Sequence, residues 1–343
     1  MFSFLGWTVI TLAAALAMHV VDGAQHLGFK NTVWQPICGL SEELGTVAGS
    51  NVKAANDILA HLETMRKAAL RAAIFVEVNV GTDKAQKGMV VQQYYTRRAT
   101  KALSKYKSMG LSSHLKAASS AGYLKGRVDE YLNLLQQVSS SANNGCLLSG
   151  AAAEQGQKLS GWKIGTTPCA LTPPQVAEQT RSKTKLTETG YQNTVHGAGS
   201  NAANTHEGTT SGSFKCRLLG SGNSDGLAHT AEAMAIYAMA GYIKMPKSDG
   251  EVSLEDADRL KDDKGTGTSA WKAAYEDVNG ALLETDTDTQ NESAALDARS
   301  DIKEAIKKLL LPKDTTDSSH IEEKINEIFG SKEDEKLKQL ETR

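Results

Sequence analysis

Two series of apolar residues, spaced alternately three and four apart, constrain the fold of this chain more than any other feature. The members of the two series are Ala55, Ile58, Leu62, Met65, Ala69, Ala72 and Val76, and then Ala117, Ala121, Leu124, Val128, Tyr131, Leu135 and Val138. This spacing places apolar side chains along one seam of an α-helix, as in a coiled coil. The sequence therefore predicts a mainly α protein built on an antiparallel helical hairpin over about residues 41–141.

A glycine-containing stretch at residues 109–112 is the predicted turn of this hairpin. Ser41 precedes two glutamates, which favours a helix that starts there with Ser41 as its N-cap. A first helix over residues 41–109 would measure roughly 100 Å, so we expect an elongated molecule. Gly81 lies inside this helix and predicts a kink or break.

The next part of the chain, about residues 145–300, is predicted to form a loop-rich lobe. Gly, Ser, Thr and Asn dominate its first half, and the helical periodicity is lost. Short β-strands are predicted at residues 161–164 and 214–219. Helices are predicted at residues 228–242, 253–260 and 271–283, followed by C-terminal helices over about 301–343.

Residues 1–23 resemble a secretory signal peptide. An apolar run of about a dozen residues, too short to span a bilayer comfortably, precedes the small residues Val21 and Gly23. The mature chain would then begin at residue 24. The net charge of −2 offers no basic surplus that would favour binding to nucleic acid.

The four cysteines are expected to form two disulfide bonds, because an even number of cysteines in a secreted chain implies a disulfide framework. Three pairings are possible, and the spacing does not choose among them. No Cys-x-x-Cys pair is present, which disfavours a zinc site. Closing a loop of more than 100 residues stabilises a fold by about 4–5 kcal/mol in the chain-entropy model. The cysteines are Cys38, Cys146, Cys169 and Cys216.

One tripeptide in the chain predicts N-glycosylation. Asn291 begins the only Asn-x-Ser/Thr sequon and follows a polar stretch. In a secreted protein this pattern is typical of a glycan acceptor.

The other reactive side chains predict no catalytic, cofactor or metal site. Ser224 lies in a Gly-x-Ser-x-Gly pattern, but the alternating β/α context of a nucleophile elbow is missing, so a turn is favoured. His229 and Glu232 would share a helix face without a third metal ligand. His61 and His114 are isolated. We therefore expect a protein that is not an enzyme, with a secreted hydrolase using Ser224 as an alternative.

Eight short stretches carry a likeness to a known family. They are residues 28–30, 34–38, 41–44, 69–72, 123–133, 168–169, 216–218 and 270–272. In these stretches the chain resembles the N-terminal domain of the class A trypanosome variant surface glycoproteins. The likeness extends over nearly all of residues 24–343 and is strongest in the predicted hairpin.

The resemblance implies an architecture and a function. It implies homodimers whose hairpins form a bundle perpendicular to the membrane, in a dense coat that faces host antibodies and evades immunity by antigenic variation. It implies that Cys38 pairs with Cys169 and Cys146 with Cys216, and that Asn291 carries a glycan. The family adds a cysteine-rich C-terminal domain and a glycolipid (GPI) anchor signal. The chain ends at Arg343 without either, so we expect a fragment of a surface protein.

A second function on the same scaffold remains open. Relatives of this family bind host serum proteins, so the resemblance also permits a receptor or a protein that binds a host serum factor. A receptor would present a defined concave or charged patch on the loop-rich lobe.

Overall fold

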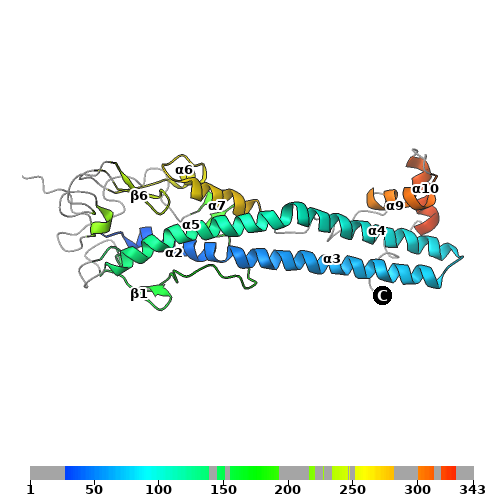
Figure 1. Cartoon of the computed structure of the whole chain (residues 1–343), viewed down its shortest axis with the longest axis horizontal. Helices are drawn as coiled ribbons and strands as arrows, with labels where there is room; N and C mark the ends of the chain where they lie inside the picture. The colour runs from blue at the N-terminus through cyan, green and yellow to red at the C-terminus, as the bar shows by residue number, and fades with distance from the viewer. Residues whose placement is uncertain are drawn as a thin grey trace, which may run out of the picture. The chain divides into compact units, whose positions relative to one another are not determined.

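The structure is a computed structural model in which the chain divides into two compact units (Figure 1). Unit 1 comprises Met1–Gly45, Ser120–Pro174 and Ser182–Glu276, and unit 2 comprises Thr46–Ser119, Gln175–Arg181 and Asp277–Arg343. The structure describes residues 28–138, 145–150, 155–192, 216–220, 227, 234–245, 247, 252–281, 300–312 and 318–329. Most residues of these ranges are helical, which confirms the mainly α prediction.

Unit 2 is built on two antiparallel helices, α3 (Val47–Val78) and α4 (Asp83–Lys105) (Figure 1). The predicted first seam is buried between them, so this part of the helical hairpin is confirmed. Full burial of one such side chain contributes about 1.5–3 kcal/mol. The buried residues are Ile58, Leu62, Met65 and Ala72 on α3, and Val90, Val91, Tyr94, Tyr95 and Ala99 on α4.

The turn of the hairpin lies at residues 79–82, so the prediction of a turn at 109–112 was wrong. Gly81 takes a left-handed φ of 82°, and the Asn79 amide closes α3 by donating to the Phe75 carbonyl at 3.2 Å. Tyr106–Gly110 is instead a π-helical segment, η1, that leads directly into α5 (Leu111–Gln137). One helical glycine costs only about 1 kcal/mol, which does not end a helix, whereas a left-handed glycine reverses the chain.

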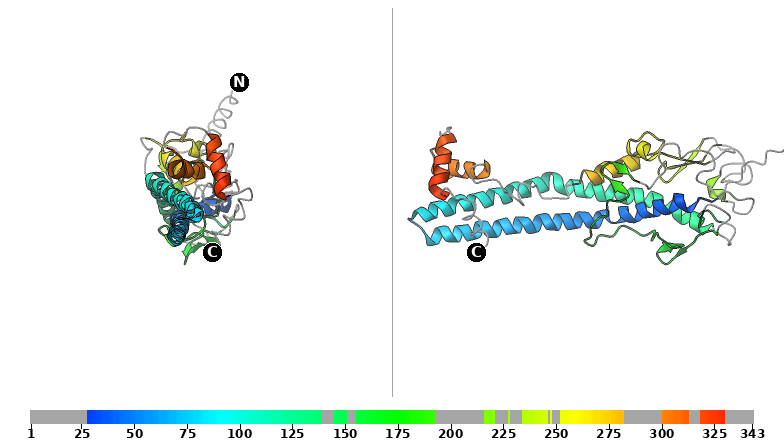
Figure 2. Two further views of the ribbon diagram at one scale, coloured as in Figure 1. Left: turned by 90° about the vertical axis from the view of Figure 1, so that its right-hand side faces the viewer. Right: turned by 180° about the vertical axis from the view of Figure 1, so that it is seen from behind.

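Two further helices of unit 2 pack on α4 (Figure 2). They are α9 (Ser300–Leu310) and α10 (Ser318–Phe329), and both lie where the apolar stripe predicted helices. Their buried residues Ile302, Ala305, Ile306, Ile325 and Ile328 join the same apolar cluster as the α3–α4 seam. Arg97 of α4 also forms an ion pair with Glu304 of α9.

Unit 1 contains α2 (Asn31–Gly45) and the part of α5 from Ser120 onward. Helix α2 begins ten residues before the predicted N-cap, so Ser41 lies inside the helix and the capping prediction was wrong. Most of the second predicted seam is buried. Ala121, Leu124, Val128 and Leu135 are buried in this unit and Ala117 in unit 2, whereas Tyr131 is half-buried and Val138 is 43% exposed. The core of unit 1 consists of Val33, Trp34, Ile37, Leu40 and Leu44 on α2, with Ala121, Leu124, Val128, Leu132 and Leu135 on α5.

Three small antiparallel sheets complete unit 1. The first has the order β1 (Leu159–Ser160), β2 (Lys163–Ile164) and β3 (Thr167–Pro168), and the second pairs β4 (Leu186–Thr187) with β5 (Gly190–Tyr191). In the third, β6 (Ile236–Ala238) pairs with β7 (Ile243–Met245), which pairs with β8 (Ser253–Leu254). In Figure 1 the first sheet and strand β6 lie on opposite sides of the α2–α5 pair.

Some predictions for the lobe were wrong. The strand near residues 161–164 is present as β2, but Arg217–Leu219 forms a 3-10 turn, η2, instead of a strand. The described part of the predicted helix 228–242 is strand β6 and a tight turn in which Met239, Ala240 and Gly241 all have positive φ. The high Ala and Met content favours a helix locally, and strand pairing overrides this preference.

The predicted short helix at 253–260 is strand β8 followed by α6 (Ala257–Lys261), and the helix predicted at 271–283 is α7 (Ser269–Asn279). Among the described residues, no helix is long and apolar enough to cross a membrane.

Candidate functional site: the disulfide-clamped lobe

Two disulfide bonds hold the described residues of unit 1 together, and we call this part of the molecule the clamped lobe. Cys38 of α2 is bonded to Cys169, just after β3, with Cα atoms 5.1 Å apart. Cys146 is bonded to Cys216, with Cα atoms 4.9 Å apart. These pairings are the ones that the family resemblance implies. They tie the irregular segments after β3 and around η2 to the helical core.

The segment before α2 is joined to the second disulfide by backbone hydrogen bonds. The Phe29 amide donates to the Cys146 carbonyl at 2.7 Å, and the Leu148 amide donates to the Phe29 carbonyl at 2.9 Å. The buried indole of Trp34 donates to the Leu148 carbonyl at 2.8 Å. Gly28 is required here, because a Cβ atom would lie 2.4 Å from the Gly145 carbonyl oxygen.

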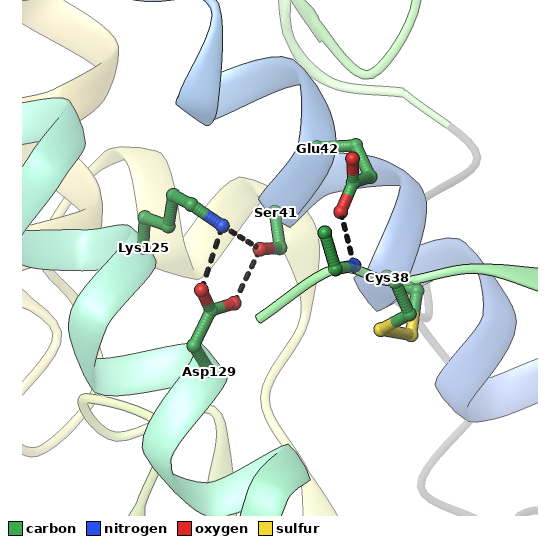
Figure 3. The surroundings of a disulfide bond; sticks show 7 residues. Cys38, Ser41, Glu42, Lys125 and Asp129 are labelled. Carbon is green, nitrogen blue, oxygen red and sulfur yellow. Dashed lines mark hydrogen bonds and ion pairs between the residues drawn. A yellow bond between two sulfur atoms is a disulfide. The ribbon is translucent and has the colours of Figure 1, made fainter. Parts of the chain in front are cut away.

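A carboxylate supports the first disulfide from the neighbouring turn of α2 (Figure 3). Glu42 accepts a hydrogen bond at 2.7 Å from the amide of Ala170, the residue after Cys169. The strand end is therefore held at two adjacent points, one covalent and one by a hydrogen bond to a charged group, which is stronger than a neutral one.

A buried triad of polar side chains joins α2 to α5 (Figure 3). The Lys125 ammonium donates to Asp129 at 2.6 Å and to the Ser41 hydroxyl at 2.8 Å, and Ser41 donates to Asp129. Lys125 is only 4% exposed. Because each charge has a partner, the triad offsets the cost of burial and sets the register of the two helices.

A second buried carboxylate holds the strand pair β4–β5 to α2. Glu43 is 5% exposed. It accepts hydrogen bonds from the amides of Thr184, Lys185 and Leu186 at 3.0, 2.8 and 3.2 Å, and from the Ser182 hydroxyl at 2.9 Å. Burial raises the pKa of the Glu43 carboxyl, but the hydrogen bonds from Lys185, Ser182, Leu186 and Thr184 outweigh it and leave this pKa below its ordinary value.

Buried aromatic residues connect β5 to α7. The Tyr191 ring packs edge-on against the Trp271 ring, with centroids 5.1 Å apart, and its hydroxyl donates to the Trp271 carbonyl. Burial raises the pKa of Tyr191, so the phenol stays protonated and remains a donor. The Trp271 indole donates to the Met239 carbonyl at 3.0 Å, which holds the β6–β7 turn.

The sequence-predicted reactive residues do not form a site in the described part of the chain. Ser224, His229, Glu232 and the sequon residue Asn291 lie outside the described residues. His61 and His114 lie on α3 and α5 of unit 2, and the His114 ring packs against Tyr106. No group of three or more metal-ligating side chains occurs among the residues that the structure describes.

The polar clusters of the clamped lobe are suited to holding loops, not to reacting with a substrate. Ser41 and Lys125 resemble a serine–lysine nucleophile pair, but Ser41 is 0% exposed and its hydroxyl is bound on both sides. Sequence reasoning missed this triad because Ser41 lies 84 and 88 residues from its partners. The only local signal was the four-residue spacing of Lys125 and Asp129.

Replacing Lys125 with Met should destabilise the protein by about 3–5 kcal/mol, because it leaves the Asp129 charge buried without its partner. The double variant Lys125→Met/Asp129→Leu should recover at least half of this loss. Urea unfolding followed by circular dichroism measures both. Lys53→Met, which removes an exposed ion pair with Asp57, is the control and should have little effect. Equal losses for Lys53→Met and Lys125→Met would contradict the role of the triad.

Replacing Glu43 with Gln should destabilise the protein by about 1.5–3 kcal/mol at neutral pH, because the amide group cannot accept all the hydrogen bonds. Since the folded-state pKa of Glu43 is lowered, its contribution is present above about pH 4.5 and is lost as the pH falls through the folded value. The variant should therefore show a shallower acid limb in thermal unfolding measured against pH. Glu77→Gln, at an exposed site on α3, should keep the wild-type acid limb, and an unchanged limb for Glu43→Gln would refute the assignment.

Comparisons with known proteins agree with this architecture. The family model described as "Trypanosome variant surface glycoprotein (A-type)" matches residues 10–343. Variant surface glycoprotein MITAT 1.1 of Trypanosoma brucei brucei is 32% identical over 332 residues, which cover 96% of this chain and 66% of the relative. MITAT 1.2 of the same organism is 31% identical over 335 residues, covering 97% and 69%. The chain thus spans about two thirds of the length of these curated relatives.

A solved structure extends the likeness to three dimensions. The structure titled "Structure of MITat 1.1" superimposes with a TM-score of 0.84 at 30% sequence identity, and the match covers 92% of this chain and 87% of that one. The family model matches residues 10–343, and the structure of MITat 1.1 has the same fold as this chain. The chain therefore belongs to the A-type trypanosome variant surface glycoproteins, a family of surface coat proteins and not of enzymes.

Proposed function

We propose that this chain is the N-terminal body of a coat antigen that shields the parasite plasma membrane and takes part in antigenic variation and immune evasion. The observation that carries the proposal is the family match over residues 10–343. The clamped lobe supports it physically, because disulfides and buried polar contacts fix a loop layer whose exposed residues are free to change.

Different residues of the lobe maintain the fold and face the solvent, which suits an antigen whose surface must vary. The residues that hold the lobe, such as Cys38, Trp34 and Glu43, are buried. The turn between β1 and β2, by contrast, exposes Trp162 at its tip. Substitutions at exposed turn positions of this kind usually change stability by less than about 0.5 kcal/mol, so host antibodies could meet a changed surface on an unchanged fold.

Homodimerisation is proposed through a group of exposed apolar side chains on unit 2. Asn51 of α3 donates a hydrogen bond to the His114 carbonyl of α5 at 2.9 Å. The residues that flank Asn51 and His114 in sequence therefore lie close together in space. Large apolar side chains exposed at about this level are Val52, Leu59, Met109, Leu111 and Leu115. A second copy would cover them, and sedimentation equilibrium of the purified protein reports whether the mass is that of a dimer.

Export and modification are proposed from the sequence and the family. Residues 1–23 would direct the chain to the secretory pathway, and Asn291 would carry an N-glycan. A glycolipid anchor on a C-terminal part would then hold the protein on the outer face of the plasma membrane. Peptide mapping with and without glycosidase treatment reports the occupancy of Asn291.

The coat role predicts dense, uniform display on living cells. We expect an antibody raised against this chain to label the entire surface of non-permeabilised trypanosomes that express the full-length protein as their main surface product. Labelling that stays inside the cell or in a small surface region would contradict a coat role. Strong capture of one host serum protein by the purified chain would instead favour the receptor function.

A further inference from the structure

Residues 175–181 form an irregular segment of unit 2 that lies against α3, and we call this segment the strap. It belongs to no helix or strand. Two prolines, Pro173 and Pro174, come just before it, and a proline restricts the residue that precedes it to extended conformations. The chain therefore reaches the strap in the extended form that a protease can bind through strand-like main-chain hydrogen bonds.

The middle of the strap is accessible to an enzyme. Val176 is 69% exposed, and Ala177 and Glu178 are also exposed. Within the described part of the chain, no backbone carbonyl accepts a hydrogen bond from the amides of these three residues. Exposed segments of this kind open at a low cost in free energy and are preferred sites of proteolytic nicking.

Few contacts hold the middle of the strap on α3. The Ala177 carbonyl oxygen lies so close to Gly49 of α3 that a Cβ atom there would be 2.1 Å from it. The Asn56 side chain donates to the Glu178 carboxylate, and both residues are exposed. Water competes for a hydrogen bond between exposed groups, so this bond opposes the lifting of the strap only weakly.

Exposure alone does not distinguish Val176 from other valines of unit 2. Val78 and Val80 are 78% and 70% exposed. However, Val78 is the last residue of α3, and Val80 lies in a tight turn in which the Thr82 amide donates to the Asn79 carbonyl at 3.1 Å. A helix end or a tight turn has to unfold before it fits a protease, whereas the strap only has to lift.

We propose that the peptide bond between Val176 and Ala177 is a nicking site for an endoprotease whose primary pocket is small and apolar, as in elastase. The Val176 side chain would fill this pocket. In the reaction one water molecule is added and the C–N bond breaks, so that Val176 ends in a carboxylate and Ala177 begins with an ammonium group. The proposal does not depend on the coat function.

The cut would leave a single covalent molecule. Cys146 lies before the cut and Cys216 after it, so the disulfide between them joins the two products. Glu43 of the first product also accepts hydrogen bonds from the amides of Thr184, Lys185 and Leu186 of the second. We therefore expect the clamped lobe to stay assembled after the cut.

The test is timed digestion of the purified chain with a low concentration of elastase, followed by mass spectrometry of the products. We expect a new N-terminus at Ala177, which a cut at any other bond does not give. On a denaturing gel, the chains on either side of this cut should separate only after reduction. Val176→Asp should slow the appearance of the new terminus by roughly tenfold or more, because a small apolar pocket rejects a charged side chain.

Two variants that loosen the strap should have the opposite effect. Asn56→Ala removes the hydrogen bond to Glu178, and Gly49→Ala places a methyl group where the Ala177 carbonyl lies. Each should speed the cut by roughly threefold or more, because cleavage follows the population of the open segment. Their controls are Thr64→Ala, at an exposed site of α3, and Gly126→Ala, at a helical glycine with open space around it. Both controls should be cut at the wild-type rate.

Circular dichroism confirms that each variant is folded. Three outcomes would overturn the proposal. The first is that no terminus forms at Ala177, or that cuts after Val78 or Val80 form as fast as the cut after Val176. The second is that Asn56→Ala and Gly49→Ala are both cut no faster than the wild type. The third is that the two products separate without a reductant.

Discussion

The buried apolar seams between long helices are the interaction on which the rest of the structure depends. In unit 2, Leu62 and Met65 of α3 meet the apolar face of α4, and in unit 1, Trp34 and Ile37 of α2 lie buried with Leu132 of α5. These contacts are local to the helices and require nothing from the loops. The strands, by contrast, are only two or three residues long and would not persist without the helices.

The clamped lobe adds polar and covalent contacts on top of the apolar seam. Lys125 and Glu43 are charged and buried, and each is bound by several partners. Such groups contribute specificity more than bulk stability, because a shifted register would leave a buried charge without its partners.

The sequence was informative where structure is set by local periodicity. Most members of both seams were predicted correctly, and Ile58 and Leu124 lie buried as the spacing requires, but Val138 is 43% exposed and the buried Leu132 was not among the predicted members. The turn was misplaced because Gly81 and Gly110 look alike in sequence, and only one adopts a left-handed conformation. The roles of Ser41 and Glu43 depend on partners more than 80 residues away in the sequence. No local sequence pattern therefore predicts these contacts. The cysteine pairing came from the family resemblance, since spacing left three possibilities open.

Hydrogen exchange measured by mass spectrometry, on the oxidised and the reduced protein, tests most directly whether the helices carry the fold and the disulfides clamp the lobe. Peptides from α3, α4 and α5 should keep slow exchange in both forms. Peptides that contain β2–β3 and the segment after Cys146 should exchange much faster after reduction. Loss of protection in the helices together with the lobe, or unchanged protection of the lobe after reduction, would contradict this account.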